Sequence, residues 1–216
     1  MFILTENNNI AHHFIAELRD VTIQHDSMRF RRNLERLGEL MAYEISKTMR
    51  YRPRVVETPL GFAHMQELEE QPVLVPILRA GLPFYQGFLN LFDRAPSAFI
   101  GAFRGQHAAD FTFEIEMRYI AAPDLSSREL ILIDPMLATG KSVLLTVEAL
   151  MQYGKPNKIH VVSVIASREG VMYVQQHLPE AHLWTGALDK ELNNQFYIVP
   201  GLGDAGDLAF GAKIST

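Results

Sequence analysis

The feature of this chain that most constrains its fold is a series of short, nearly continuous apolar runs along its 216 residues. Strands buried on both faces of a sheet have such runs, because hydrophobic layers cover both sides. Stretches with helical apolar spacing, 82–92 and 143–153, lie between the runs. This alternation predicts an α/β fold with a central parallel sheet flanked by helices. The apolar runs cover residues 73–78, 98–103, 130–133 and 159–165.

The N-terminal part of the chain predicts two helices. Apolar residues recur at helical spacing, and Asp26 with Ser27 marks the start of the second helix. We expect both helices to pack on one side of the sheet. The first stripe consists of Ile10, Phe14 and Leu18, and the second of Phe30, Leu34, Leu37, Met41 and Ile45.

The stretch from Phe111 to Tyr119 breaks the βαβ rhythm. Its apolar and polar residues alternate strictly, which predicts a half-buried antiparallel strand. Because it follows Arg104, at the end of an apolar run, it is consistent with one arm of a hood over a ligand. A strand that merely covers an edge of the core fits the pattern equally well.

Ligands of parallel sheets bind beyond the carboxyl ends of the strands, so the residues directly after each apolar run are the candidates for a site. These are Arg79, Ala80 and Gly81; Arg104 and Gly105; residues 134–142; and Ser167, Arg168, Glu169 and Gly170.

The turn at 134–142 has the features of an anion site, because it joins a strand to the start of an amphipathic helix. Thr139, Gly140, Lys141 and Ser142 offer backbone N–H groups and two hydroxyls to a monophosphate, and the helix dipole favours negative charge there. Asp134 repels phosphate but accepts hydrogen bonds from sugar hydroxyls. The turn therefore suits a phosphorylated sugar, with the phosphate towards Thr139.

The letters Gly140, Lys141 and Ser142 also fit the end of a nucleoside-triphosphate P-loop. The first glycine of that motif would fall at position 135, where Pro135 has no N–H to donate. This spacing argues against the P-loop. A purely structural strand-turn-helix is the other alternative.

Three segments of the chain have distinctive motifs: Val75-Pro-Ile-Leu-Arg-Ala-Gly, Asp134-Pro-Met-Leu-Ala-Thr-Gly and Tyr197-Ile-Val-Pro-Gly-Leu-Gly-Asp-Ala-Gly. Together they resemble the uracil phosphoribosyltransferase family. In that family the first motif is the pyrophosphate-side loop, the second binds phosphoribosyl pyrophosphate, and the third is the uracil-binding loop. The match runs in consistent order from about residue 29 to residue 213.

This resemblance implies a type I phosphoribosyltransferase fold with a small hood, and transfer of 5-phosphoribosyl from phosphoribosyl pyrophosphate to uracil, giving UMP and pyrophosphate. It implies one domain over residues 1–216, with N-terminal helices in 1–50, a hood strand in 105–120 and a base-binding segment in 189–213. Mg²⁺ accompanies the donor in the family, and homodimers or higher homo-oligomers are usual. Activation by GTP stays open, because residues 105–119 lack the family's proline-containing hood pattern.

The site residues follow from the same resemblance. Contacts with the donor fall on Arg79, Arg104, Asp134, Pro135, Met136, Leu137, Ala138, Thr139, Gly140, Lys141, Ser142 and Asp204. Contacts with uracil fall on Ile198, Gly203, Asp204 and Ala205, and the catalytic residues are Arg79, Arg104, Asp134 and Asp204.

The chemistry of these residues agrees with the reaction. Loss of pyrophosphate leaves positive charge on the sugar, so catalysis consists mainly of positioning and electrostatic stabilisation. Arg79 and Arg104 can fork onto phosphate oxygens, and Asp204 either holds the donor with its metal or favours loss of the N1 proton of uracil. Lys141, where the family usually has glycine, is expected to point into solvent. Met136 and Leu137 suit apolar packing under the turn better than ligand contact.

Composition narrows the partners. The net charge of -5 gives no reason to expect a nucleic-acid partner, and no apolar run approaches the ~20 residues of a membrane span. The absence of cysteine and of a signal-like N-terminus suits the cytoplasm. We expect no metal site among the eight histidines; Mg²⁺ would be held mainly by the donor pyrophosphate, near Asp204. A regulator that binds nucleotide or RNA, and an enzyme for a different base, are the alternatives.

Overall fold

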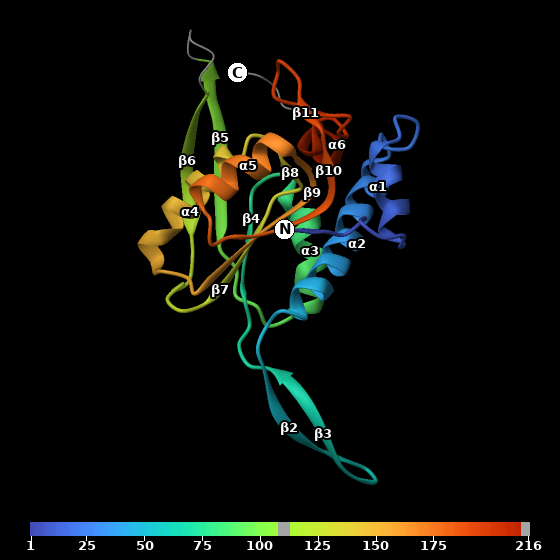
Figure 1. Ribbon diagram of the computed structural model, residues 1–216, viewed down its shortest axis with the longest axis vertical. Coiled ribbons are helices and arrows are strands. Elements are labelled where there is room, and N and C mark those ends of the chain that lie inside the picture. Colours follow the sequence, from blue (N-terminus) through green and yellow to red (C-terminus); the bar gives the residue numbers. More distant parts are fainter. Residues whose placement is uncertain (108–112, 213–216) are drawn as a thin grey trace.

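A parallel sheet with strand order β1-β10-β9-β7-β4 forms the centre of the computed structural model (Figure 1). The structure describes residues 1–107 and 113–212, with only the backbone for 102–107 and 113–118. The short β8 continues the pairing along β9. The strands are β1 (Phe2–Ile3), β4 (Val73–Pro76), β7 (Glu129–Ile133), β8 (Met136–Leu137), β9 (Lys158–Ser167) and β10 (His182–Asp189).

Helices cover both faces of this sheet, which explains its continuous apolar runs. Ile131 belongs to the core under α2 and α3, whereas its neighbours Leu130 and Leu132 belong to the core under α4 and α5. Successive side chains of a strand point to opposite faces, so both sets must be apolar. One face carries α1 (Ala11–Arg19), α2 (Ser27–Ser46) and α3 (Gly81–Leu91), and the other carries α4 (Lys141–Leu150) and α5 (Arg168–His177). No described helix is long and apolar enough to cross a membrane.

The helix signals in the sequence are confirmed. Asp26 caps α2 by accepting a hydrogen bond from the backbone N–H of Arg29 at 3.0 Å, and the predicted apolar stripe is buried. After α4 a single 3₁₀ turn, η1 (Met151–Tyr153), leads to Gly154 at φ +116°. The βαβ rhythm therefore identified both the parallel sheet and the helices that alternate with it.

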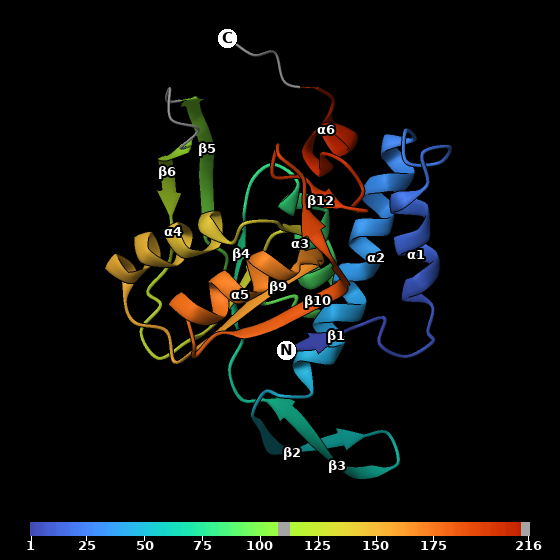
Figure 2. The ribbon, with the colours of Figure 1, turned by 45° about the horizontal axis from the view of Figure 1, so that its top comes forward.

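The run at 98–103 differs from its prediction as a strand of the central sheet. Its residues from Phe99 on lie in β5 (Phe99–His107), which pairs antiparallel with β6 (Phe113–Ala121). Isolated parallel bridges at Leu74–Ser97 and Ile77–Ile100 join this part of the chain to the segment that contains β4. The expected alternating strand is thus β6, while Phe111 and Thr112 lie outside the described residues. This hairpin stands at the same end of the molecule as α6 (Ala205–Phe210), as a hood would (Figure 2).

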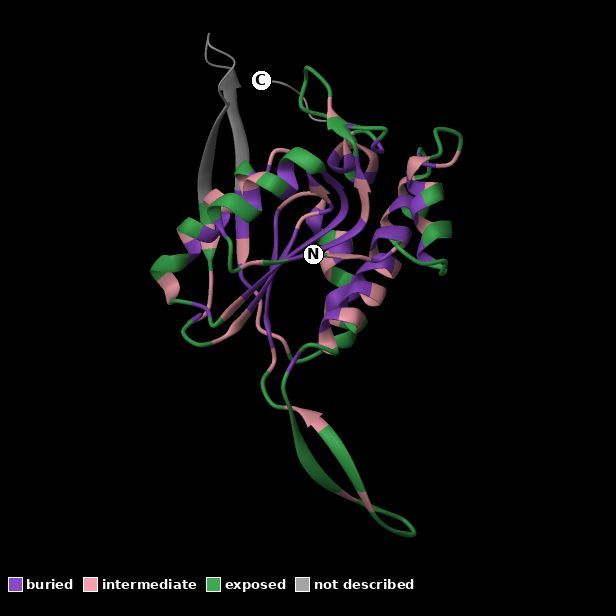
Figure 3. Ribbon diagram, viewed as in Figure 1, coloured by how far each residue is buried: buried purple, intermediate pink, exposed green. Residues whose placement is uncertain are grey.

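A second hairpin, formed by β2 (Tyr51–Thr58) and β3 (Gly61–Leu68), projects from the opposite end of the molecule (Figure 1). We call it the arm. The sequence analysis did not predict it, because most of its residues are exposed and show no buried face (Figure 3). Near the C-terminus, β11 (Glu191–Leu192) and β12 (Ile198–Val199) form another small antiparallel pair.

Candidate active site

The loop after β4 packs against the end of β7. The backbone N–H of Ile77 donates to the carbonyl oxygen of Ile133 at 2.9 Å. A Cβ atom on Gly81 would lie 2.9 Å from the same carbonyl, so glycine permits this close approach. The Leu78–Arg79 peptide in this loop is cis. These contacts place the loop that carries Arg79 beside the strand end that carries Asp134.

The turn after β7 has the geometry of an anion site. Gly140 has φ +77° and precedes α4, whose first backbone N–H groups have no intrahelical acceptor. The hydroxyl of Thr139 accepts the N–H of Lys141 at 3.4 Å, and Asp134 Oδ1 accepts the N–H of Met136 at 3.3 Å. The turn therefore presents donors near Thr139 and a carboxylate at its start, as expected for a phosphate and a sugar.

The residues at the start of α5 pack against this turn and hydrogen-bond to it. Ser167 donates its hydroxyl to the carbonyl of Ala138 at 2.6 Å and accepts the N–H of Gly170 at 2.9 Å. A Cβ atom on Gly170 would lie only 2.3 Å from the Ala138 carbonyl. Ser167 and Gly170, which the sequence placed at the ligand end of the sheet, thus hold the turn in shape.

Other residues of the turn anchor it in the protein. The side chain of Leu137 is 3% exposed and belongs to the core, which agrees with its expected apolar packing. The carbonyl of Pro135 accepts the N–H groups of Val164 and Ile165, each at 3.0 Å. Any contact of Leu137 with a ligand would have to use its main chain. Lys141 is exposed, as expected for a side chain that points into solvent, and Ser142 is half-buried.

The C-terminal glycine-rich segment forms a loop and a short helix. Asp204 caps α6 by accepting the N–H of Asp207 at 3.0 Å. Gly203 is exposed at φ +93°, whereas the side chains of Ile198 and Ala205 are 4% and 3% exposed. A flat base would therefore meet the main chain of this loop more readily than the side chains of Ile198 and Ala205.

Arg79 connects the loop after β4 to this C-terminal segment. Its Nη2 donates to Asp207 Oδ1 at 2.9 Å, and its Nη1 donates to the carbonyl of Gly211 at 3.3 Å. A Cβ on Gly206 would lie 3.6 Å from Arg79 Nη2 and 3.2 Å from Asp204 Oδ1, so Arg79 and Asp204 lie close together. The sequence analysis missed Asp207. Its position three residues after the capping Asp204 was the available signal, because acidic residues are favoured in the first turn of a helix.

For Arg104 the structure gives the backbone alone, in β5 opposite Ile115. Its side chain lies outside the described part of the chain, so its predicted contact with the donor stays a prediction. The two strands change register between Arg104 and His107.

Residues 1–107 and 113–212 offer no evident site where protein side chains alone would bind a metal ion. They contain no group of three or more His, Cys, Asp or Glu side chains that could hold an ion. Two acidic residues lie close to Arg79: Asp207, which contacts it, and Asp204. Mg²⁺ commonly uses one or two carboxylates together with substrate phosphates and water, and these two side chains fit such a role.

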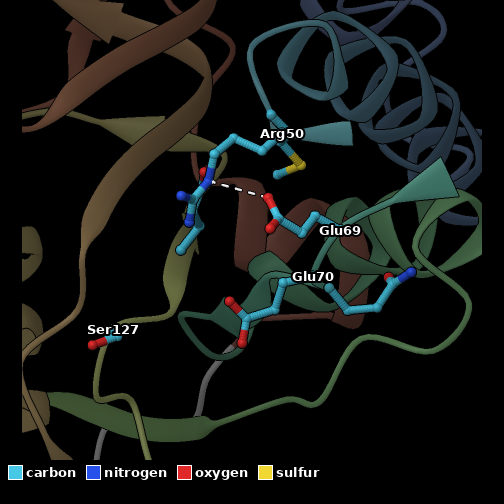
Figure 4. A pocket seen from close by; sticks show the side chains of 7 residues that line it. Arg50, Glu69, Glu70 and Ser127 are labelled. Atoms are coloured by element: carbon cyan, nitrogen blue, oxygen red, sulfur yellow. Dashed lines mark ion pairs between the residues drawn. The ribbon is translucent and has the colours of Figure 1, made fainter. Parts of the chain in front are cut away.

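A small cavity lies at the other edge of the sheet, near the amino ends of β4 and β7 (Figure 4). It measures about 20 Å³, room for a single water molecule. Arg50 and Glu69 pair across it at 3.6 Å. Its size and place separate it from the loops around Arg79. The lining residues are Met49, Arg50, Glu69, Glu70, Gln71, Ser127 and Glu129.

Comparison with known proteins gives a consistent result. The family model described as uracil phosphoribosyltransferase matches residues 5–212. A uracil phosphoribosyltransferase of Porphyromonas gingivalis is 49% identical over 212 residues, covering 98% of each chain, and one of Pyrococcus furiosus is 40% identical over 207 residues, covering 94% of this chain and 87% of that protein. Among solved structures, the AQ2163 protein from Aquifex aeolicus superposes with a TM-score of 0.87 at 29% identity, covering 100% of both chains.

Proposed function

The chain belongs to the uracil phosphoribosyltransferase family, and we propose that Arg79, Thr139 and Asp204 mark the three sides of its active site. The enzyme transfers 5-phosphoribosyl from phosphoribosyl pyrophosphate to uracil and releases pyrophosphate, leaving UMP. The observation that carries the assignment of residues is the contact of Arg79 with Asp207, because it joins the pyrophosphate-side loop to the base-side segment.

The 5′-phosphate would sit on the first turn of α4. Backbone N–H groups there, with the hydroxyls of Thr139 and Ser142, neutralise the phosphate without a dedicated cation. Asp134 would accept hydrogen bonds from ribose hydroxyls, which fixes the sugar ring relative to the phosphate. Pro135, Met136, Leu137 and Ala138 shape the turn, and Gly140 with Lys141 contributes main chain.

Arg79 would bind the pyrophosphate. Charge accumulates on that group as the C1–oxygen bond breaks, so a guanidinium fixed beside it stabilises the transition state more than the ground state. Arg104, on the hood hairpin, is the second proposed cation. Mg²⁺ supplies further positive charge when it is bound with the donor, and we assign Asp204 to the donor and its metal, because this carboxylate lies beside the Arg79 guanidinium.

Uracil would lie against the main chain of residues 203–205. Its edge offers acceptor, donor and acceptor groups in turn, which a glycine-rich main chain can match with N–H, C=O and N–H groups. Cytosine would leave some of these groups unpaired, and such unpaired groups give strong discrimination. Ile198 and Ala205 bury their side chains and would support the loop from below.

We also propose that the enzyme is a cytoplasmic homo-oligomer that assembles through the arm. The arm exposes large apolar side chains on an isolated two-stranded hairpin, which is poorly stable by itself. The exposed fraction is 58% for Val55, 100% for Leu60, 74% for Phe62 and 55% for Met65. A second copy of the chain would cover these groups. The cytoplasmic assignment rests on the donor, whose phosphate charges oppose passage through a membrane.

The decisive assay mixes the protein with phosphoribosyl pyrophosphate, Mg²⁺ and a panel of uracil, cytosine, hypoxanthine and adenine. Chromatography of nucleotides and measurement of released pyrophosphate give the products. UMP formed from uracil alone is the expected result. Turnover of another base in preference to uracil would contradict the assigned specificity, and binding of nucleotide without turnover would point to a regulator.

A further inference from the structure

We propose that Arg19 and Asp189 act as a positioning pair that fixes the uracil-binding loop and thereby sets the affinity for uracil. This inference rests on the proposed placement of uracil at residues 203–205. Neither residue belongs to the donor turn at 134–142 or to the uracil-binding loop at 197–206, although Asp189 is the first residue of the base-binding segment. Arg19 is the last residue of α1, and Asp189 is the last residue of β10.

The two side chains form a bidentate ion pair. Arg19 Nη1 donates to Asp189 Oδ2 at 2.8 Å, and Arg19 Nη2 donates to Asp189 Oδ1 at 2.8 Å. The carboxylate side chain is 7% exposed and the guanidinium side chain 23%. Such a planar fork holds its partner in a defined orientation, which a single contact does not.

Both partners also bind the backbone of Gly201, in the middle of the uracil-binding loop. The N–H of Gly201 donates to Asp189 Oδ2 at 2.9 Å, and its carbonyl accepts from Arg19 Nη1 at 3.0 Å. Gly201 has φ +57°, and a Cβ there would lie 2.0 Å from the carbonyl of Ile198. The pair therefore fixes both polar groups of a residue that must be glycine.

Because the pair occupies the backbone of Gly201, uracil would bind to the residues after Gly201. The two backbone groups of Gly201 already have partners, so recognition of uracil falls to residues 203–205. A glycine-rich loop has many accessible conformations, and the pair selects one of them before the base arrives. The donor turn is held separately by Ser167, so loss of the pair should affect uracil far more than the donor.

Steady-state kinetics of Arg19→Gln test this inference. We expect KM for uracil to rise by about tenfold or more, because loss of positioning is costly even away from the reacting atoms. KM for phosphoribosyl pyrophosphate should rise much less, because Ser167 holds the donor turn separately. Arg19→Lys, which keeps the charge but loses the fork, should give an intermediate KM for uracil. Arg29→Gln is the matched control, since Arg29 forks onto Glu17 and joins α1 to α2 without contact to the loop.

The double variant Arg19→Gln/Asp189→Asn separates positioning from stability. It removes the unpaired buried charge that Arg19→Gln leaves, so the thermal midpoint should recover while KM for uracil stays raised. Recovery of both together would overturn the inference, as would an unchanged KM for uracil in Arg19→Gln. If Arg19→Gln does not fold, a wild-type KM for uracil in the double variant or in Arg19→Lys overturns it. A wild-type protein that makes no UMP would instead contradict the proposed function.

Discussion

The Nη2 atom of Arg79 lies 2.9 Å from Oδ1 of Asp207, although the two residues are 128 positions apart in the sequence. Through this contact the loop after β4 meets the segment that caps and forms α6. A phosphoribosyltransferase must hold a charged leaving group and an incoming base on the same ribose at once. The contact between Arg79 and Asp207 brings the proposed pyrophosphate-side loop and the proposed uracil-binding segment next to each other.

Arg79→Lys should lower kcat/KM for phosphoribosyl pyrophosphate by about 100-fold, because an ammonium cannot fork onto two phosphate oxygens in the transition state. Initial rates at varied donor concentration measure this. Arg128→Lys is the control: Arg128 pairs with Glu70 at 2.9 Å next to the amino end of β7, and its replacement should leave the rate unchanged. Equal effects of the two replacements would remove Arg79 from the site.

Asp204→Asn should raise KM for the donor by about tenfold, most strongly when Mg²⁺ is limiting, because a charged contact is lost. Asparagine caps helices as well as aspartate does, so α6 should persist. The pH profile of kcat should keep its shape. A profile that loses its dependence on a basic group, with an unchanged KM for the donor, would assign Asp204 to removal of the uracil N1 proton instead.

The burial of His160 leads us to expect that the free energy of unfolding falls on mild acidification. It is 0% exposed; its Nδ1 accepts from Trp184 at 3.0 Å, so its Nε2 donates to Glu129 at 3.1 Å. Burial lowers its pKa from 6.5, an effect that the Glu129 carboxylate opposes and Lys158 and His182 reinforce. Because the unfolded chain binds the proton more readily, stability is complete above pH 6.5 and is lost as the pH falls below it.

Thermal midpoints between about pH 8 and pH 5 test this prediction. His160→Gln should lose stability overall but show a weaker dependence on pH than the wild type. The pKa of His182, also lowered by burial, leaves a residual slope. His25→Gln, at an exposed position, serves as the control. An undiminished slope in His160→Gln would show that the acid sensitivity arises elsewhere.

Phe62→Lys should shift the protein towards the monomer, because it places a charge in the apolar surface of the arm that a second copy is proposed to cover. Sedimentation velocity at several concentrations gives the distribution of species. Val21→Lys replaces another exposed apolar residue, 69% exposed and away from the arm, and should leave assembly unchanged. A wild-type protein that sediments as a monomer would contradict the proposed oligomer.

The parts of the fold that follow from burial were predictable from the sequence. Apolar runs and helical stripes report directly on which faces are covered, and they identified the sheet, α2 and the strand-turn-helix at Gly140. The arm was not predictable in this way, because its exposed residues carry no hydrophobic period. The strand β10 was missed for a related reason: Thr185 and Gly186 interrupt its apolar run.

The candidate site likewise contains residues that were predictable from the sequence and residues that were not. Local sequence marked Thr139 and Gly140, since turn chemistry depends on near neighbours, whereas Asp204 was identified from the resemblance of its segment to the family's uracil-binding loop. The roles of Asp207, Arg19 and Asp189 depend on contacts between distant segments, such as the 170 positions that separate Arg19 from Asp189. Arginines are common at the ends of surface helices, so the sequence around Arg19 alone did not indicate that it pairs with Asp189.

A crystal structure with a non-reactive donor analogue, Mg²⁺ and uracil tests the central claim most directly. The account predicts the 5′-phosphate on the N–H groups after Thr139, the pyrophosphate against Arg79, and uracil hydrogen-bonded to the main chain of residues 203–205, all around one ribose. Ligands found on separate surfaces, or a base bound away from the loop at 197–206, would contradict it.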